Sequence, residues 1–177
     1  MKKSIFIVVL VLLVTTAYSS VNYSYIINFK KTENMRFFVL ATNEDSFSIY
    51  GDQFIANYLN RQGFIAEYVP DNDVLSARLM QEFYPVNPNN PIPEVYVITH
   101  KYYLVRSVSE MGLGNIVNEV TQGVILDVKQ VTNPRFFDFD TALFAAQAEL
   151  FEKDDMVTEG MEEVLIKVLN DIFGRIK

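Results

Sequence analysis

The sequence predicts a single domain of the α/β (α+β) class, in which helices pack on one mixed β-sheet. Two observations lead to this class. In the first half of the chain, short apolar runs alternate with segments of helical spacing, whereas longer segments rich in β-branched and aromatic residues follow in the second half. The chain has 177 residues, 50% of them hydrophobic, which is enough to bury one core. The expected order is β-α-β-α-β-β-β-α within residues 36–177.

A strand, a helix and a second strand open the domain. Residues 36–41 (RFFVLA) form a continuous apolar run, as in a strand covered on both faces. Asp45 or Ser46 is the expected cap of the next helix, and Gly63 is the left-handed residue that ends it before a strand at residues 64–69. Two strands joined in this way form a right-handed crossover and run parallel. The apolar face expected for the helix comprises Phe47, Tyr50, Phe54, Ile55, Tyr58 and Leu59.

A second helix and a proline-rich segment come next. The helix is expected over residues 71–84, and residues 85–93 contain four of the six prolines, which favours a surface loop. The face expected to be buried on this helix comprises Val74, Ala77, Met80 and Tyr84.

Long strands are expected in the second half. Residues 94–108 have the length and composition of a strand, and residues 109–115 (SEMGLGN) are expected to form a loop. Residues 123–131 alternate between apolar and polar, which places Asp127 and Lys129 on a solvent-facing side of a strand.

A turn, one more strand and a helix complete the order. After the turn at residues 132–134, residues 135–151 are expected to return antiparallel, although residues 142–151 are also compatible with a helix. The closing helix has one apolar stripe, which comprises Met161, Val164, Leu165, Val168, Leu169, Ile172, Phe173 and Ile176.

The first residues have the three parts of a secretory signal. Lys2 and Lys3 precede an unbroken apolar run at residues 5–14, and small residues then favour cleavage between Ser19 and Ser20. The two lysines hold the amino terminus in the cytoplasm, so the rest of the chain is expected to be exported.

The expected organisation is a signal peptide at residues 1–19, a linker at residues 20–35 and one α/β domain at residues 36–177. The alternative is an uncleaved anchor at residues 5–25, through which the protein would contact the membrane. Either organisation predicts a periplasmic or otherwise extracytoplasmic location.

Charge and composition exclude several classes of function. The formal net charge is −7 and no run of Lys or Arg interrupts it, so nucleic acid is not an expected partner. The chain has no cysteine, which removes disulfides, thiolate nucleophiles, cysteine zinc sites and lipid attachment at cysteine. Residues 112–115 (GLGN) lack the lysine of a phosphate-binding loop, and we expect no cofactor.

Few residues have the arrangement of a catalytic or metal site. His100 is the only histidine, so a two-histidine metal motif is impossible, and no G-x-S-x-G sequence would supply a serine for a triad. Asp71 and Asp73 are explained by helix capping. Asp138 and Asp140 are expected on one face of a strand and lack the further oxygen donors of a calcium loop. The sequence therefore predicts no catalytic residue and no metal site.

Two groups of residues are candidates for a partner-binding surface. Thr42, Asn43 and Glu44 follow the first strand of the domain, at the edge where α/β proteins bind ligands. The second group contains aromatic residues near cations together with two aspartates, and comprises Tyr102, Tyr103, Phe136, Asp138 and Asp140.

Residues 37–69 (FFVLATNEDSFSIYGDQFIANYLNRQGFIAEYV) resemble the start of exported α/β domains of bacterial envelope proteins. These are the amino-terminal domain of TolB translocation proteins, the curli-secretion lipoproteins and the penicillin-binding-protein activator lipoproteins. The resemblance rests on a turn with Leu59, Gly63 and Phe64, and covers most of residues 36–176. The chain departs from it because it has no cysteine to lipidate and no match to the pore-forming segments of the curli family. The resemblance implies a non-catalytic domain that binds other envelope components, and it assigns no functional residue.

The expected function is therefore that of an exported, non-catalytic accessory protein that binds one or more other envelope proteins. The alternative is an exported hydrolase or ligand-binding protein that uses the carboxylates near Asp138 and Asp140, since paired acids serve glycosidases. The position of these carboxylates bears on the choice, because carboxylates that bind a ligand must line a concave pocket and not an open sheet face.

Overall fold

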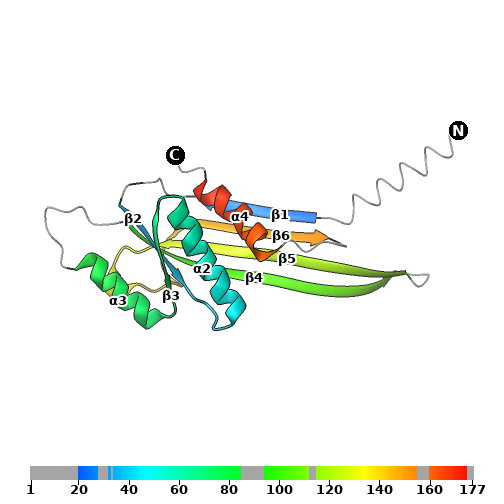
Figure 1. Cartoon of the computed structure of the whole chain (residues 1–177), viewed down its shortest axis with the longest axis horizontal. Helices are drawn as coiled ribbons and strands as arrows, with labels where there is room; N and C mark the ends of the chain where they lie inside the picture. The colour runs from blue at the N-terminus through cyan, green and yellow to red at the C-terminus, as the bar shows by residue number, and fades with distance from the viewer. Residues whose placement is uncertain are drawn as a thin grey trace.

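The computed structural model shows one six-stranded mixed sheet with helices on both faces (Figure 1), which confirms the predicted fold class. It describes residues 20–27, 32, 34–84, 94–111, 115–154 and 160–174, and only the backbone of residues 20–27, 105–111, 115–121 and 152–154. The strand order is β1-β6-β5-β4-β2-β3. The elements are β1 (Ser20–Ile27), β2 (Met35–Leu40), α2 (Ser46–Arg61), β3 (Ile65–Val69), α3 (Asn72–Phe83), β4 (Glu94–Met111), β5 (Asn115–Gln130), the 3-10 helix η1 (Pro134–Phe136), β6 (Phe144–Asp154) and α4 (Met161–Phe173).

Three predicted segments lie outside the described residues. They are the signal peptide at residues 1–19, the proline-rich loop at residues 85–93 and the end of the closing helix at Ile176.

The strands β2, β3 and the start of β4 form the parallel part of the sheet. β2 pairs in parallel with β3 on one side and with β4 on the other. Asp45 caps α2, as predicted, by accepting hydrogen bonds from the amides of Phe47 (3.1 Å) and Ser48 (2.9 Å). Gly63 has a φ of 83°, the left-handed conformation expected where α2 gives way to β3. The predicted crossover is therefore present.

The strands β4, β5, β6 and β1 form the antiparallel part. β4 and β5 pair from Tyr96 and Gln130 to Met111 and Asn115, so they form a long hairpin that projects beyond the helices (Figure 1). The predicted loop at residues 109–115 is too long, because β4 continues to Met111 and β5 begins at Asn115. Backbone pairing across the hairpin keeps these residues extended despite their weak strand propensity.

Residues 144–154 form the strand β6, which settles the choice between strand and helix. β6 pairs with β5 on one side and with β1 on the other, and this pairing overrides the helix propensity of its alanines. Ala146 and Ala148 are fully buried in the core, where their small side chains let α4 pack closely on the sheet.

Residues 20–27 differ from the predicted linker. Ser20–Ile27 form β1, which pairs antiparallel with β6 from Ser20 and Lys153 to Ile27 and Ala146. The segment has no long apolar run and therefore little local strand signal, and pairing with the hydrogen-bonding groups of β6 makes it a strand.

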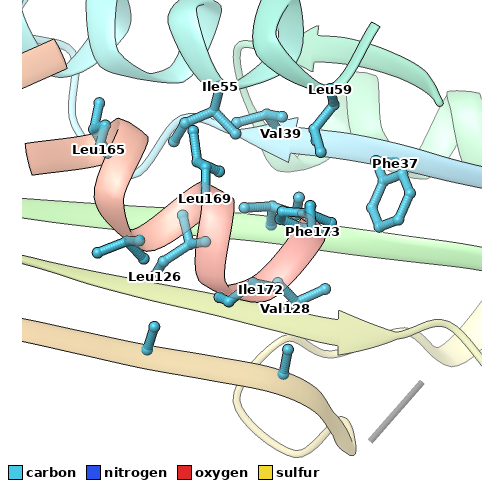
Figure 2. Close-up of a cluster of buried hydrophobic side chains, with 14 of the residues drawn as sticks. Phe37, Val39, Ile55, Leu59, Leu126, Val128, Leu165, Leu169, Ile172 and Phe173 are labelled. Carbon is cyan, nitrogen blue, oxygen red and sulfur yellow. The ribbon is translucent and has the colours of Figure 1, made fainter. Parts of the chain in front are cut away.

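The larger core lies between the sheet and the helices α2 and α4. Figure 2 shows Ile55 and Leu59 of α2 and Leu169 of α4 directed toward the sheet, and all three are fully buried. The ring of Phe37 on β2 meets that of Phe173 on α4 edge-on, at 5.5 Å between centroids. The described part of the predicted α4 stripe, from Met161 to Phe173, is buried as expected.

Two predicted helix faces are rotated relative to the structure. On α2, Phe47 and Tyr50 are 50% exposed, and the buried residues are Gly51, Asp52, Ile55, Ala56 and Leu59. On α3, Ala77 and Met80 are exposed, and the fully covered residues are Leu75 and Leu79, which pack on the opposite face of the sheet against Phe38, Leu40, Val95 and Val97. The α2 face differs because the buried polar residue Asp52 has a partner on the sheet.

Candidate functional site

A cleft with a volume of about 630 Å³ lies beside the carboxyl end of β2. The chain leaves β2 for α2 on one face of the sheet and leaves β3 for α3 on the other face. Open α/β sheets bind ligands where successive connections diverge in this way. The polar side chains that line the cleft include Thr42, Thr99, Lys101, Asp127, Lys129 and Asp140.

The segment between β5 and β6 supplies one wall of the cleft and places both predicted aspartates there. The expected strand at residues 135–141 is wrong, because η1 and a turn occupy this region. Asp138 stabilises the turn, since its Oδ1 accepts from the amide of Asp140 (3.0 Å) and its Oδ2 accepts from the hydroxyl of Thr141 (3.1 Å). Asp138 and Asp140 therefore line a concave site and not an open sheet face.

The side chain of Lys129 was predicted to face solvent, but it is only 5% exposed. Its Nζ donates to the carbonyl oxygen of Phe139 at 2.5 Å and lies 3.5 Å from that of Asp140. The same Nζ lies 4.5 Å from the ring centroid of Phe139 and 4.4 Å from that of Phe144. The segment between β5 and β6 folds over this side of β5, which explains the burial.

Two more charged groups line the cleft beside Lys129. Asp127 accepts a hydrogen bond at its Oδ1 from the amide nitrogen of Gln147 (3.0 Å), and Lys101 lies exposed on β4. In the part of the chain that the structure describes, the ion pairs within 4.0 Å include Arg36 with Glu82, Arg78 with Glu67 and His100 with Asp52. Neither cleft lysine belongs to such a pair.

A histidine and an aspartate meet on the other face of the sheet, under α2. The Nδ1 of His100 lies 2.7 Å from the Oδ1 of Asp52, and both side chains are almost completely buried. Burial raises the pKa of Asp52, against the opposing hydrogen bond and attraction of His100. The other oxygen of Asp52 is buried and has no hydrogen-bond partner among the described residues.

Helix α2 seals this pair from solvent. A Cβ atom at Gly51 would lie 2.5 Å from the Nε2 of His100, so the helix backbone covers the ring, and Met161 of α4 lies close by. A substrate would have to displace α2 to reach the imidazole. The pair therefore positions α2 on the sheet. The burial of Asp52 was not predicted, although its spacing from Ile55 and Leu59 places it on the same helix face.

The projecting part of β4 has a free edge. β2 pairs with β4 only as far as Val39 and Ile98, whereas β4 continues to Met111 with β5 on its other side. The hydroxyl of Thr42 donates to the carbonyl oxygen of His100 at 3.1 Å. This carbonyl is the first outward-facing one of β4 beyond the residues that pair with β2.

The direction of the edge groups follows from the pairing. The carbonyl of Val95 accepts from the amide of Val131, and the carbonyl of His100 faces Thr42. Because backbone direction alternates along an antiparallel strand, Tyr102 and Leu104 direct their N–H and C=O groups away from β5. Within the described residues, no strand pairs with this side of β4 beyond Ile98.

The opposite edge of the parallel part, on β3, is covered at Ala66. The side-chain amide of Asn60 donates to the carbonyl oxygen of Ala66 (2.8 Å), and its oxygen accepts from the amide of Ala66 (3.0 Å). Asn60 also donates to the carbonyl oxygen of Ala56, which holds the side chain in place. One side chain thus occupies both groups with which Ala66 would pair with another strand.

The structure disperses the predicted partner-binding residues. Thr42 lines the cleft, as do both aspartates, whereas Asn43 and Glu44 are exposed outside its lining. Phe136 is exposed on η1.

The two adjacent tyrosines of β4 face opposite sides of the sheet. Tyr102 packs against Phe47 of α2, at 5.3 Å between centroids. Tyr103 packs against Phe151 of β6, across Gly123, where a Cβ atom would lie 2.4 Å from the Phe151 ring. The predicted residues therefore belong to separate surfaces.

The described residues contain neither a cluster of metal ligands nor a helix suited to span a membrane. They contain no group of three or more His, Asp or Glu side chains placed to hold a metal ion. None of their helices has the length and apolar character required to span a membrane.

The comparisons with known proteins concern the fold. The chain matches no protein-family model and no curated protein. It is similar to the PelC dodecamer from Paraburkholderia phytofirmans, with a TM-score of 0.50, 15% identity, and coverage of 86% of this chain and 98% of that one. A neuraminyllactose-binding hemagglutinin homolog from Helicobacter pylori has a TM-score of 0.35, 12% identity, and coverage of 82% of each chain. At 15% identity, the similarity to PelC shows a shared fold only.

Proposed function

We propose that this protein is an exported accessory protein of the cell envelope that acts without catalysis, by binding an extended segment of another protein. The binding site is the edge of β4 beyond Ile98, and the backbone groups of Tyr102 and Leu104, with which no described strand pairs, carry the proposal. Such groups select an extended strand, because only a strand presents hydrogen-bonding groups at the same spacing. This edge is the observation on which the proposal rests.

Side chains beside the edge support a partner strand. Phe47 is 50% exposed and Leu104 is 46% exposed, and the ring of Tyr102 packs against that of Phe47. A strand added to β4 would cover part of this apolar surface, which adds about 25 cal/mol for each Å² of apolar area buried. Backbone pairing would supply affinity, and these side chains would supply specificity.

Export is supported by the amino-terminal sequence and by β1. The signal-like residues 1–19 end immediately before Ser20, the first residue of β1. The alternative anchor at residues 5–25 overlaps β1, and residues 5–19 alone fall short of the roughly 20 apolar residues that a spanning helix needs. Cleavage between Ser19 and Ser20 would leave β1 intact.

A binding function without catalysis is supported by the candidate groups themselves. The imidazole of His100 is covered by α2, and both carboxylate oxygens of Asp138 accept hydrogen bonds inside their own turn. Neither group is placed to exchange a proton with a substrate.

A second candidate function is ligand binding near Asp138 and Asp140, and one observation favours it. Both residues line the cleft, which meets the geometric condition for a ligand site. The test is a thermal-shift measurement on the purified protein with small polar compounds. Stabilisation by at least one compound supports this candidate, and an unchanged unfolding temperature with all of them contradicts it.

Three substitutions on β4 test the edge. Leu104→Pro removes an N–H that faces away from β5, so the fold should tolerate it while a partner strand loses a hydrogen bond. Leu104→Ala keeps that N–H and shortens only the side chain. Tyr103→Pro removes an N–H that faces β5 and should destabilise the hairpin, which makes it the control for backbone direction.

The readout is photo-crosslinking in intact cells from a residue placed at Tyr102, with mass spectrometry of the linked peptide. We expect one specific envelope protein, lost with Leu104→Pro and largely retained with Leu104→Ala. A crosslinker at Ile65 on β3 should give no specific product. Equal crosslinking with Leu104→Pro contradicts the proposal. A linked peptide from a second copy of this chain would replace it with self-assembly, the arrangement named for the PelC dodecamer.

A further inference from the structure

We infer that the cleft beside β2 binds a small zwitterion, namely a free α-amino acid with an apolar side chain. This inference names the ligand class for the second candidate function, on which it rests, and it is independent of the β4 edge. The juxtaposition of Lys101 and Asp127, two oppositely charged residues on the sheet side of the cleft, carries it.

The sheet register places these two charges one diagonal step apart. Thr99 pairs with Asp127 across β4 and β5, and Lys101 pairs with Ile125, so Lys101 and Asp127 share a face as diagonal neighbours. Such neighbours have Cα atoms roughly 7–8 Å apart. An α-amino acid carries its ammonium and carboxylate groups on one carbon, so it fits between a carboxylate and an ammonium placed in this way.

Both groups have capacity for a ligand. Gln147 donates to the Oδ1 of Asp127, which fixes the carboxylate and leaves its Oδ2 for a ligand ammonium group. Lys101 forms no ion pair within 4.0 Å among the residues that the structure describes, so its ammonium group can bind a ligand carboxylate. Charge-assisted hydrogen bonds of this kind are about twice as strong as neutral ones.

The balance of charge excludes ligands with a single sign of charge. Lys101 supplies positive charge on the sheet side of the cleft, and Lys129 lies buried two residues along β5 from Asp127, on the side away from Lys101, with its Nζ held by the Phe139 carbonyl. Asp138 and Asp140 add negative charge on the opposite wall. An anion would therefore meet carboxylates and a cation would meet lysines, whereas a zwitterion presents the opposite charge to each.

Apolar side chains in the cleft indicate the kind of amino acid. Leu40 and Leu75 lie at its base, and Phe137 and Phe139 lie half-buried in the wall formed by the β5–β6 segment. An aliphatic or aromatic ligand side chain would be removed from water against these groups. L-leucine and L-phenylalanine are therefore the probes of choice.

Isothermal titration calorimetry of the purified protein with each probe tests the inference. We expect both amino acids to bind, and we expect N-acetyl-L-leucine amide, which has lost both charges, not to bind. Lys101→Met and Asp127→Asn should each weaken binding roughly 10-fold to 100-fold, since each removes one hydrogen bond between charged groups. Asp127→Asn keeps the acceptor for Gln147, so the fold should be preserved.

Matched substitutions on the other face of the sheet are the controls. Lys167→Met and Glu163→Gln on α4 change the same charges and should leave binding unchanged. Equal binding of N-acetyl-L-leucine amide overturns the inference. Binding of a neutral sugar such as glucose without either amino acid also overturns it but leaves ligand binding in the cleft standing. No heat from any of these compounds overturns both.

Discussion

The two halves of the sheet treat their exposed strand edges in opposite ways. In the helix-covered part, Asn60 occupies both backbone groups of Ala66 and covers the edge of β3 at that residue. In the projecting part, β4 runs on past Ile98 with β5 on one side only, and the groups of Tyr102 and Leu104 face outward. An exposed strand edge is a hazard that proteins ordinarily block, and the outward groups of β4 are those that we propose to pair with a partner strand.

Side-chain burial also differs between the helix-covered part and the projecting part of the sheet. The covered part has helices on both faces and holds the fully buried side chains of α2 and α4, whereas Leu104 on the projecting part is 46% exposed. His100 marks the boundary, since its side chain lies under α2 and its carbonyl accepts from Thr42. Stability is therefore concentrated in the helix-covered part of the sheet, whereas the projecting part presents an exposed surface.

The largest effect should come from breaking the pair at the boundary. His100→Ala leaves the carboxylate of Asp52 buried without a partner, which should lower the free energy of unfolding by about 3–5 kcal/mol. Urea denaturation measures this change. A loss below about 1 kcal/mol would mean that the pair is not sealed as described.

A pair of leucine substitutions tests whether stability is divided between the halves. Leu169→Ala opens a cavity under α4 and should cost about 2–5 kcal/mol, whereas Leu104→Ala on the hairpin should change stability by less than about 0.5 kcal/mol. Urea denaturation midpoints compare the two variants. Equal losses would contradict the contrast between the covered and the projecting part.

Asn60→Ala should expose the edge of β3 at Ala66. It removes the hydrogen bonds to both groups of Ala66 and should cost about 1–3 kcal/mol, with new self-association through β3. The control is Asn57→Ala, an exposed position on the same helix. Analytical ultracentrifugation with urea denaturation measures both effects, and a monomer as stable as the control would show that Asn60 does not guard the edge.

The smallest expected effect is on the pH dependence of stability, and it tests the His100–Asp52 pair at the boundary between the two parts. Because burial raises the pKa of Asp52 above its ordinary 3.8, the folded protein holds this proton more tightly than the unfolded chain. The resulting stability is present below pH 3.8 and is lost as the pH rises through the folded-state pKa. We expect the free energy of unfolding to fall with rising pH relative to Asp52→Asn. Parallel profiles for the two proteins would contradict this assignment.

The sequence predicted those parts of the fold that depend on local signals. The α4 stripe, the cap at Asp45 and the left-handed Gly63 are read from spacing and from backbone chemistry, and the structure confirms them. The faces of α2 and α3 were misplaced, because apolar count alone does not show which side meets the sheet. The spacing of Asp52 from Ile55 and Leu59 places it on the buried face of α2, but its partner His100 lies 48 residues away and follows only from the fold.

The candidate site was predictable only in part. Thr42, Asp138 and Asp140 were singled out, and the structure brings them to one cleft. The burial of Lys129 depends on a segment that folds back over β5. The diagonal placement of Lys101 and Asp127 depends on the register of β4 and β5. The free edge of β4 depends on where β2 stops, which is a property of the sheet and not of either strand.

Amide hydrogen exchange in the free protein, followed residue by residue by NMR, tests the central claim most directly. The account predicts fast exchange at Tyr102 and Leu104, whose N–H groups face outward, and slow exchange at Tyr103, whose N–H faces β5. On β3, Ala66 should exchange slowly and become fast in Asn60→Ala. Equal protection of Tyr102, Tyr103 and Leu104 would show that the edge of β4 is already covered, and would contradict the account.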